Sequence, residues 1–228
     1  MTTEVKIVSS VALATAVLIG SVLYFSTRNL PPAPSTAVAT ADPALADAGL
    51  LVREDSYSKG DADAEVTVVE FADFQCEACR ASYPQVEGVL KDYEGRGVRF
   101  VLRNFPLPNH KNSQIAANAA EAAGEQGKYW EMYSKLFAGQ DEWTSDPPRP
   151  KSAAQATAII AGYARELGLD EQAFRAAVDG RKFNAKLSRD LADGEKLGIN
   201  GTPTFFVNGV QAQEVGEIRT LIERELAK

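Results

Sequence analysis

A pair of cysteines at the junction of a strand and a helix most constrains the fold. Residues 65–71 (EVTVVEF) are β-branched and apolar with polar interruptions, which predicts a β-strand. A turn-like segment, ADFQ, follows, and the stretch from Cys76 to about Tyr93 has a helical pattern. The only two cysteines of the chain, Cys76 and Cys79, are therefore expected in the first turn of a helix that leaves a sheet.

The spacing of the two cysteines suggests different roles for their sulfurs. A sulfur in the first turn of a helix faces unpaired backbone N–H groups and the positive end of the helix dipole, and both favour the thiolate. We therefore expect Cys76 to be the nucleophile. Cys79, one turn later on the same face, is placed to attack a mixed disulfide on Cys76 and release the partner. An inert disulfide or two buried thiols is the alternative that spacing alone leaves open.

The rest of the chain predicts a mixed α/β domain. Residues 98–105 (VRFVLRNF) are predicted to form a second strand and TPTFFVNG, from Thr202, a third. Asn208-Gly209 supplies a tight hairpin turn to a short fourth strand near Val210, and an amphipathic helix, EIRTLIERELAK, ends the chain. About ninety residues between the second and third strands have helical patterns. This order predicts a helical insertion within a small mixed sheet.

An apolar run near the amino terminus predicts a membrane anchor. Residues 7–25 carry no charge and are long enough to span the hydrocarbon core as a helix. A cleaved signal peptide is the alternative, because Ala37-Val38-Ala39 has small residues at a suitable spacing, although it lies some distance past the apolar run. The flanking charges give no clear orientation. An outward orientation of the domain therefore depends on the chemistry of the cysteines.

The segment after the anchor is typical of a spacer. PPAPSTAVATADPALADAG is rich in Pro, Ala, Ser and Thr and has no aromatic residue, so it cannot bury enough surface to fold alone. We expect a membrane anchor over residues 1–30, a flexible linker over 31–59 and one domain over 60–228. The helical insertion of that domain is expected at about residues 107–198.

Composition argues against several other classes of protein. Acidic residues outnumber basic ones, 31 to 24, and the basic residues are scattered, so nucleic acid is not an expected partner. Two cysteines and one histidine, His110, are too few for a closed zinc site with four Cys or His ligands. No metal or organic cofactor is implied. We expect His110 to be solvated or to cap a helix rather than to act as an acid or base.

A proline late in the chain adds context to the cysteines. Pro203 opens a strand in the segment Gly201-Thr202-Pro203-Thr204, where the cis form costs only about 0.5 to 1 kcal/mol. A cis bond would turn the backbone of Thr202 outward beside the sulfurs, ready to pair with an extended substrate segment. A trans proline at a strand start is the common alternative.

Three segments of the chain together resemble the DsbA-like branch of the thioredoxin superfamily. They are EFADFQCEACR, RNFPL with the Ala-rich helix after it, and GTPTFFVNG. The resemblance covers about residue 60 to the C-terminus. It implies a thioredoxin-like fold with an inserted helical domain, in an extracytoplasmic enzyme that passes its disulfide to substrate proteins and is reoxidised by a membrane partner. It also implies Cys76 as the attacking sulfur, Cys79 as the buried resolving sulfur, and Pro203 as a cis-proline with Thr202 before it.

Two further positions gain an interpretation from this resemblance. Glu70 falls where family members often carry a buried acid that moves protons to and from the second cysteine; an exposed strand carboxylate is the alternative. Strongly oxidising members have Pro-His between the cysteines, whereas this chain has Glu77-Ala78. Because weaker stabilisation of the reduced thiolate gives a less oxidising disulfide, we expect a milder oxidant. Alternatively, Glu77 only complements the helix dipole.

These observations predict a single-pass membrane protein whose domain faces outside the cytoplasm. We expect it to oxidise the thiols of unfolded or partly folded exported proteins and to be reoxidised by a membrane redox partner. A reductase or isomerase kept reduced by a membrane donor is one alternative, because the direction follows from potential and partner rather than from fold. A binding module or chaperone that keeps the cysteines as a staple is another.

Overall fold

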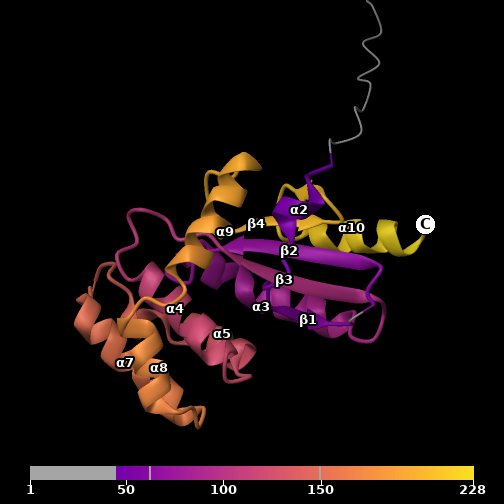
Figure 1. Cartoon of the computed structure of the whole chain (residues 1–228). Coiled ribbons are helices and arrows are strands. Elements are labelled where there is room, and N and C mark those ends of the chain that lie inside the picture. Colours follow the sequence, from indigo (N-terminus) through magenta and orange to yellow (C-terminus); the bar gives the residue numbers. More distant parts are fainter. Residues whose placement is uncertain (1–44, 62, 149) are drawn as a thin grey trace, which may run out of the picture. The chain divides into compact units, whose positions relative to one another are not determined.

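A five-stranded mixed sheet forms the centre of the described part of the chain (Figure 1). The computed structural model describes residues 45–61, 63–148 and 150–228. The strand order is β1-β3-β2-β4-β5, with β2 and β3 parallel and the other neighbours antiparallel. The strands are β1 (Ser58–Gly60), β2 (Val66–Ala72), β3 (Val98–Asn104), β4 (Thr204–Val207) and β5 (Val210–Ala212).

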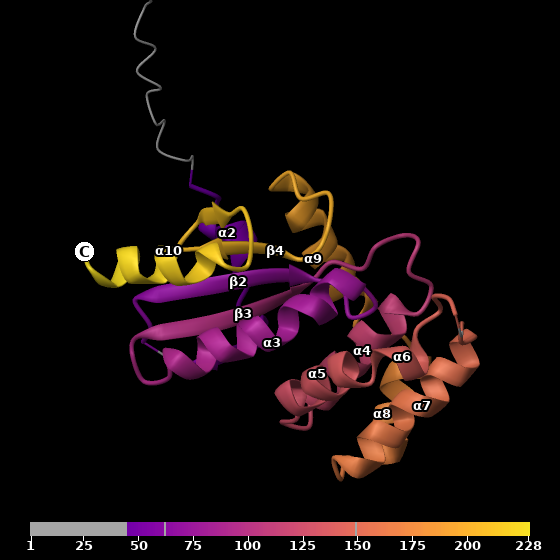
Figure 2. The same cartoon turned by 180° about the vertical axis from the view of Figure 1, so that it is seen from behind.

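The parallel pair at the centre of the sheet determines where the cysteines lie. β2 pairs with β3 in register from Val66 opposite Val98 to Ala72 opposite Asn104. The crossover between them is α3 (Glu77–Asp92), which begins directly after β2 ends and packs back on the sheet (Figure 2). The first turn of α3 therefore lies at the carboxyl edge of the parallel strands, where polar groups of several segments converge.

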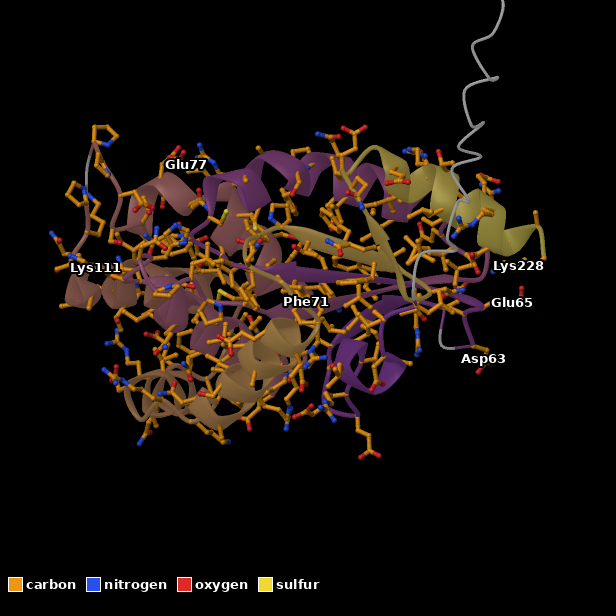
Figure 3. All side chains as sticks on the ribbon, turned by 90° about the horizontal axis from the view of Figure 1, so that it is seen from above. Asp63, Glu65, Phe71, Glu77, Lys111 and Lys228 are labelled. Atoms are coloured by element: carbon orange, nitrogen blue, oxygen red, sulfur yellow. The ribbon has the colours of Figure 1, made fainter. Side chains whose placement is uncertain are left out.

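The two faces of the sheet have separate apolar cores. On one face, Val66 and Val68 of β2 pack with α3 and with the C-terminal helix α10 (Glu217–Leu226). On the other, Val69 and Phe71 pack with Leu51 of α2 (Ala48–Leu51) and with residues near α9 (Asn184–Lys196). Phe71 makes edge-on contacts with two further phenylalanines and lies in the middle of the molecule (Figure 3).

Among the described residues, six helices lie between β3 and β4, where the sequence predicts a helical insertion. They are α4 (Ser113–Gly124), α5 (Tyr129–Ala138), α6 (Gln140–Trp143), α7 (Ala153–Glu166), α8 (Glu171–Asp179) and α9. α4 is rich in alanine and mostly buried, which lets α5, α7 and α8 pack closely against it. Aromatic contacts of Phe74 and Tyr83 with Tyr133 and Phe137 join α5 to α3 and to the turn before it.

The predicted hairpin between β4 and β5 is confirmed. Val207 pairs with Val210, so Asn208 and Gly209 are the two loop residues. Their φ angles of 45° and 86° are the positive values that such a two-residue turn requires, and Asn and Gly adopt them most readily. The side chain of Asn208 also accepts a hydrogen bond from the backbone N–H of Thr67, which fixes the hairpin to β2.

The structure corrects the expected linker over residues 31–59, because its last part belongs to the folded domain. Leu51 of α2 is 4% exposed in the second core, and β1 extends the sheet beside β3. Arg53 donates to both carboxylate oxygens of Asp193 on α9, at 2.8 and 2.7 Å. The burial of Leu51, the pairing of β1 with β3 and the ion pair of Arg53 with Asp193 attach this part of the chain to the domain.

The expected membrane anchor over residues 1–30 and the first part of the linker, up to residue 44, lie outside the described residues. Within residues 45–228, as far as they are described, no helix combines the length and the apolar character needed to cross a bilayer.

Candidate active site

Cys76 is the N-cap residue of α3, and Cys79 lies in its first turn. Cys76 has an extended backbone, and its carbonyl accepts the helical hydrogen bond from Arg80 N–H. Its side chain makes no capping bond, so its sulfur is left to face the first N–H groups of the helix. Cys76 keeps 7% of its surface exposed, whereas Cys79 keeps 0%, and both are free thiols. The sulfur nearer the helix terminus is therefore the more accessible one.

The surroundings of the two sulfurs separate their ionisation. A hydrogen bond with Cys79 lowers the pKa of Cys76 to about 5, against the opposing effect of burial. Hydrogen bonds from Thr202 and from the backbone N–H groups of Cys79 and Ala78 contribute to the lowering. Burial raises the pKa of Cys79 well above its ordinary value, and the hydrogen bond to Cys76 and the charge of Glu70 raise it further. At neutral pH the first sulfur is ionised and the second keeps its proton.

The segment that holds Pro203 lies against Cys76. The sulfur of Cys76 is 3.3 Å from the backbone oxygen of Thr202. The peptide bond between Thr202 and Pro203 is cis. Thr204 donates its hydroxyl proton to the oxygen of Gly201. The cysteine pair, Cys76 and Cys79, and the late segment with Thr202 and Pro203 thus lie together, although they come from opposite ends of the domain.

Glu70 is buried and is coupled electrostatically to both cysteines. It is 1% exposed and lies on β2 two residues from Val68, on the sheet face that packs against α3. One carboxylate oxygen has no hydrogen-bond partner. Burial, and then the negative charge of Cys76, raises the pKa of Glu70 to about 8. Glu70 is therefore buried, and its interpretation as an exposed strand carboxylate is wrong. Its role in moving protons to and from Cys79 stays a prediction.

The turn before Cys76 is held by the helical insertion. Gln140, at the start of α6, is 1% exposed and donates from its amide nitrogen to the carbonyl oxygens of Phe74 and Cys76, at 2.7 and 3.0 Å. Gln75 donates to Ser145 and accepts from the backbone N–H of Asn112. The sequence reasoning did not find Gln140, because nothing local to residue 140 indicates a contact 64 residues away.

Asp73 anchors the same turn and was also missed. Its carboxylate accepts hydrogen bonds from the backbone N–H groups of Gln75 and Leu107, both at 2.8 Å, and from the hydroxyl of Ser113 at 2.6 Å. Nδ1 of His110 lies 2.7 Å from the same carboxylate. His110 is therefore bound to Asp73 rather than solvated or acting as a helix cap. An Asp at the start of the turn, whose carboxylate can accept the backbone N–H two residues later, was the signal that could have identified Asp73.

Glu77 and Ala78, between the cysteines, are exposed. Glu77 points outward at the end of the molecule where Lys111 also lies, away from the end that holds Glu65 and Lys228 (Figure 3).

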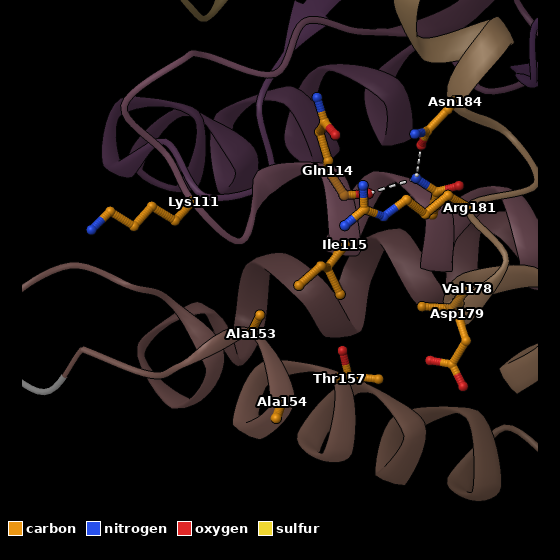
Figure 4. A pocket seen from close by; sticks show the side chains of 11 residues that line it. Lys111, Gln114, Ile115, Ala153, Ala154, Thr157, Val178, Asp179, Arg181 and Asn184 are labelled. Carbon is orange, nitrogen blue, oxygen red and sulfur yellow. Dashed lines mark hydrogen bonds between the residues drawn. The ribbon is translucent and has the colours of Figure 1, made fainter.

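A hollow of about 350 Å³ lies beside the cysteine helix, between residues of α3, Pro203 and the segment after β5. Another, of about 280 Å³, lies in the helical insertion and includes no residue of α3 (Figure 4).

Comparison with known proteins agrees with this geometry. Residues 53–224 match the family model described as thioredoxin. The chain belongs to the thioredoxin family. Among solved structures, it resembles a thioredoxin-like oxidoreductase from Silicibacter pomeroyi DSS-3 at 28% identity and a TM-score of 0.65, with 80% of this chain and 99% of the other covered. It also resembles oxidised BdbD from Bacillus subtilis at 25% identity and a TM-score of 0.66, with 76% and 94% covered.

These neighbours confirm the thioredoxin-like α/β fold. The chain also shares this fold with alpha-DsbA1 from Wolbachia pipientis, at 21% identity and a TM-score of 0.66 with 78% of this chain and 94% of the other covered, in agreement with the resemblance to the DsbA-like branch. A curated relative, Na(+)/H(+) antiporter NhaA 3 from Salinispora tropica, is 42% identical over 154 residues, which cover 67% of this chain and 22% of the antiporter. The chain spans about a quarter of the length of the curated relatives it matches.

Proposed function

We propose that this thioredoxin-family protein is an extracytoplasmic oxidase that forms disulfides in unfolded or partly folded exported proteins. The observation that carries the proposal is the state of the two sulfurs. Cys76 lies at the N-cap of α3, beside Thr202, where its pKa is lowered to about 5, while Cys79 is buried one turn on, where its pKa is raised. A stable thiolate is a good leaving group, which is the property an oxidising disulfide needs.

The proposed reaction starts from the disulfide between Cys76 and Cys79. A substrate thiolate attacks the sulfur of Cys76, the disulfide bond breaks, and Cys79 leaves and takes up a proton. The second thiolate of the substrate then attacks the substrate sulfur of this mixed disulfide, and Cys76 leaves as a thiolate. Two electrons pass to the protein. Of the two protons of the substrate dithiol, one ends on Cys79 and one goes to solvent.

Glu70 is proposed to supply the proton for Cys79. Cys79 is 0% exposed and cannot exchange protons with solvent directly. Glu70 is protonated at neutral pH, because its pKa is about 8, and its charge affects the pKa of Cys79. It therefore lies within electrostatic reach of the sulfur that must change its protonation state.

The remaining residues are proposed to bind substrate and adjust the potential. Thr202, next to the cis-linked Pro203, offers main-chain groups beside Cys76 with which an extended substrate segment could pair. Glu77, exposed between the cysteines, adds a negative charge near the thiolate. We propose that Glu77-Ala78 makes the disulfide a milder oxidant than a Pro-His pair would.

We also propose that residues 1–30 anchor the protein in a membrane, with the domain on the extracytoplasmic side and a membrane redox partner that reoxidises it. The apolar run at residues 7–25 supports the anchor. Relatives with a matching segment are named as Na(+)/H(+) antiporters, which are membrane transporters by name, and this supports a location at a membrane.

The test uses the purified full chain in detergent, with a reduced, unfolded secreted protein as substrate. We expect the oxidised protein to form disulfides in it, and neither Cys76→Ser nor Cys79→Ser to do so. With a disulfide-bonded substrate instead, Cys79→Ser should accumulate a mixed disulfide through Cys76, and Cys76→Ser should not. Faster reduction or reshuffling of a scrambled substrate by the reduced protein would favour the reductase or isomerase. Full function of Cys76→Ser in cells would favour a binding module or chaperone and overturn the proposal.

A further inference from the structure

The single histidine of the chain is fixed to the turn that leads into Cys76. His110 lies between β3 and α4, and its Nδ1 is 2.7 Å from Oδ2 of Asp73. Its side chain is 14% exposed, and that of Asp73 is 0% exposed. Asp73 is three residues before Cys76 and accepts the backbone N–H of Cys76 on its main-chain oxygen, at 3.0 Å. Two hydrogen bonds therefore connect the imidazole to the backbone of the nucleophile.

Asp73 brings a negative charge to this turn. Besides His110, its carboxylate is contacted by the N–H groups of Gln75 and Leu107 and by the hydroxyl of Ser113. N–H groups only donate, and an ionised carboxylate accepts all of these bonds. Because Asp73 is three residues before Cys76 and bonded to its backbone, an uncompensated negative charge on Asp73 would disfavour ionisation of the thiol.

We propose that His110 is a positioning and charge-compensating residue for disulfide exchange: as an imidazolium it neutralises Asp73 and thereby stabilises the Cys76 thiolate. The inference rests on the proposed function of the cysteine pair. The positive charge near the thiolate then comes from His110, in the loop between β3 and α4, because Glu77-Ala78 provides none between the cysteines. His110 acts through Asp73 and the local field and does not touch the reacting sulfurs.

The charges around His110 support this role. The hydrogen bond with Asp73 raises the pKa of His110 against the opposing effect of burial, and the charges of Asp73, Asp146 and Cys76 raise it further. Asp146 belongs to the loop after α6 and is itself bound by Gln75. Because the coupling of two titrating groups is reciprocal, a proton on His110 must favour the thiolate of Cys76 by the same factor.

A neighbouring cation provides a matched control. Lys111 follows His110 directly and is exposed, and its side chain is one of those that line the hollow of the helical insertion (Figure 4). Lys111→Gln removes the same charge from the same loop without disturbing the ion pair. His110→Gln keeps an N–H donor for Asp73 and removes only the titrating charge.

The first experiment follows the imidazole itself in the full chain by NMR. Because His110 is the only histidine, its ring signal is unambiguous. We expect the pKa of His110 to be higher in the reduced protein than in the oxidised protein, where the thiolate charge is absent. Equal pKa values in both states would overturn the proposal. This readout needs only chemical oxidation of the pair, so it stands even if the protein proves not to oxidise substrates.

The second experiment measures the Cys76 thiolate by ultraviolet absorbance. We expect His110→Gln to weaken ionisation of Cys76 by about three- to tenfold, equivalent to half a pKa unit to one unit, and Lys111→Gln to leave it unchanged. The proposal fails if both variants match the parent protein, or if both shift Cys76 equally. Should His110→Gln not fold, the comparison of the two redox states by NMR decides.

Discussion

Each of the parallel strands β2 and β3 carries a buried ionisable side chain near its end. The two side chains differ in how many hydrogen-bond and ion-pair partners they have. On β2, Glu70 is 1% exposed, has one oxygen without a partner, and has a pKa of about 8. On β3, Arg103 is 0% exposed, and its guanidinium contacts Asp190 and Asp193, each at 2.8 Å, and donates to the carbonyl of Leu51. Equal burial thus produces a neutral acid on one strand and a saturated ion cluster on the other.

The difference separates a structural site from a chemical one. The Arg103 cluster joins α2 and α9 to the sheet, and hydrogen bonds from Arg53 and Arg103 lower the pKa of Asp193 to about 2. Such a cluster is costly to break, because removal of one partner leaves a buried charge alone. Glu70 has no such partner and keeps an exchangeable proton beside the sulfurs. A buried acid that is left unpaired near a nucleophile is typical of a functional site.

Loss of the Arg103 guanidinium should have the largest effect. We expect Arg103→Met to lower the free energy of unfolding by about 3 to 5 kcal/mol, because Asp190 and Asp193 lose a buried partner. Arg189→Met is the control on α9, since Arg189 pairs with Asp55 at the surface and should contribute at most about 1 kcal/mol. Urea unfolding of the full chain in detergent measures both. Equal losses in the two variants would show that Arg103 is not the structural site.

Glu70 should make stability depend on pH in the opposite way to an ordinary acid pair. Its folded-state pKa of about 8 lies above its ordinary value of 4.5, so the unfolded chain loses the proton first as pH rises. The stability of the folded state therefore decreases between these two values. We expect Glu70→Gln to match the parent protein at acidic pH and to be more stable by a few kcal/mol near pH 8, since one pKa unit is about 1.4 kcal/mol.

The measurement for Glu70 is urea unfolding of the reduced proteins at several pH values. If the parent protein and Glu70→Gln lose stability in parallel as pH rises, Glu70 does not hold a proton in the folded state, and the contrast with Arg103 fails. The same variant should also slow formation of the mixed disulfide by the oxidised protein, because Cys79 then lacks its proposed proton donor when it leaves.

The smallest effect is expected at the surface of the site. Glu77 is exposed, so solvent screens its charge. We expect Glu77→His to lower the pKa of Cys76 by less than about one unit and to make the disulfide slightly more oxidising. Glu77→Gln separates loss of the negative charge from gain of an imidazole. If neither the pKa of Cys76 nor the reduction potential changes in Glu77→His, this dipeptide does not set the potential.

Local patterns in the sequence predicted much of the fold. The strands β2, β3 and β4, the Asn208-Gly209 hairpin and helix α3 agree with the structure, because alternation and turn residues act over short distances. β1 and α2 were not predicted. They are three and four residues long, and they are ordered by a sheet edge and by Asp193, which lie far away in the sequence.

The site was predictable only in part, for the same reason. The spacing of Cys76 and Cys79 and the position of Pro203 are visible in the sequence. The burial of Glu70 was also within reach, because it alternates with Val66 and Val68 on one face of β2. The contact of Gln140 with Cys76 arises only when the helical insertion folds back on the turn. No local pattern contains that information.

The most direct test of the account is an ultraviolet titration of the thiolate in the reduced full chain, with Cys76→Ser as the reference. We expect a thiolate to appear with a midpoint near pH 5, as the pKa of Cys76 requires, and to be absent from Cys76→Ser at that pH. A first thiolate only near pH 8.5, the approximate ordinary value for cysteine, would contradict the account. The start of α3 would then not activate its sulfur.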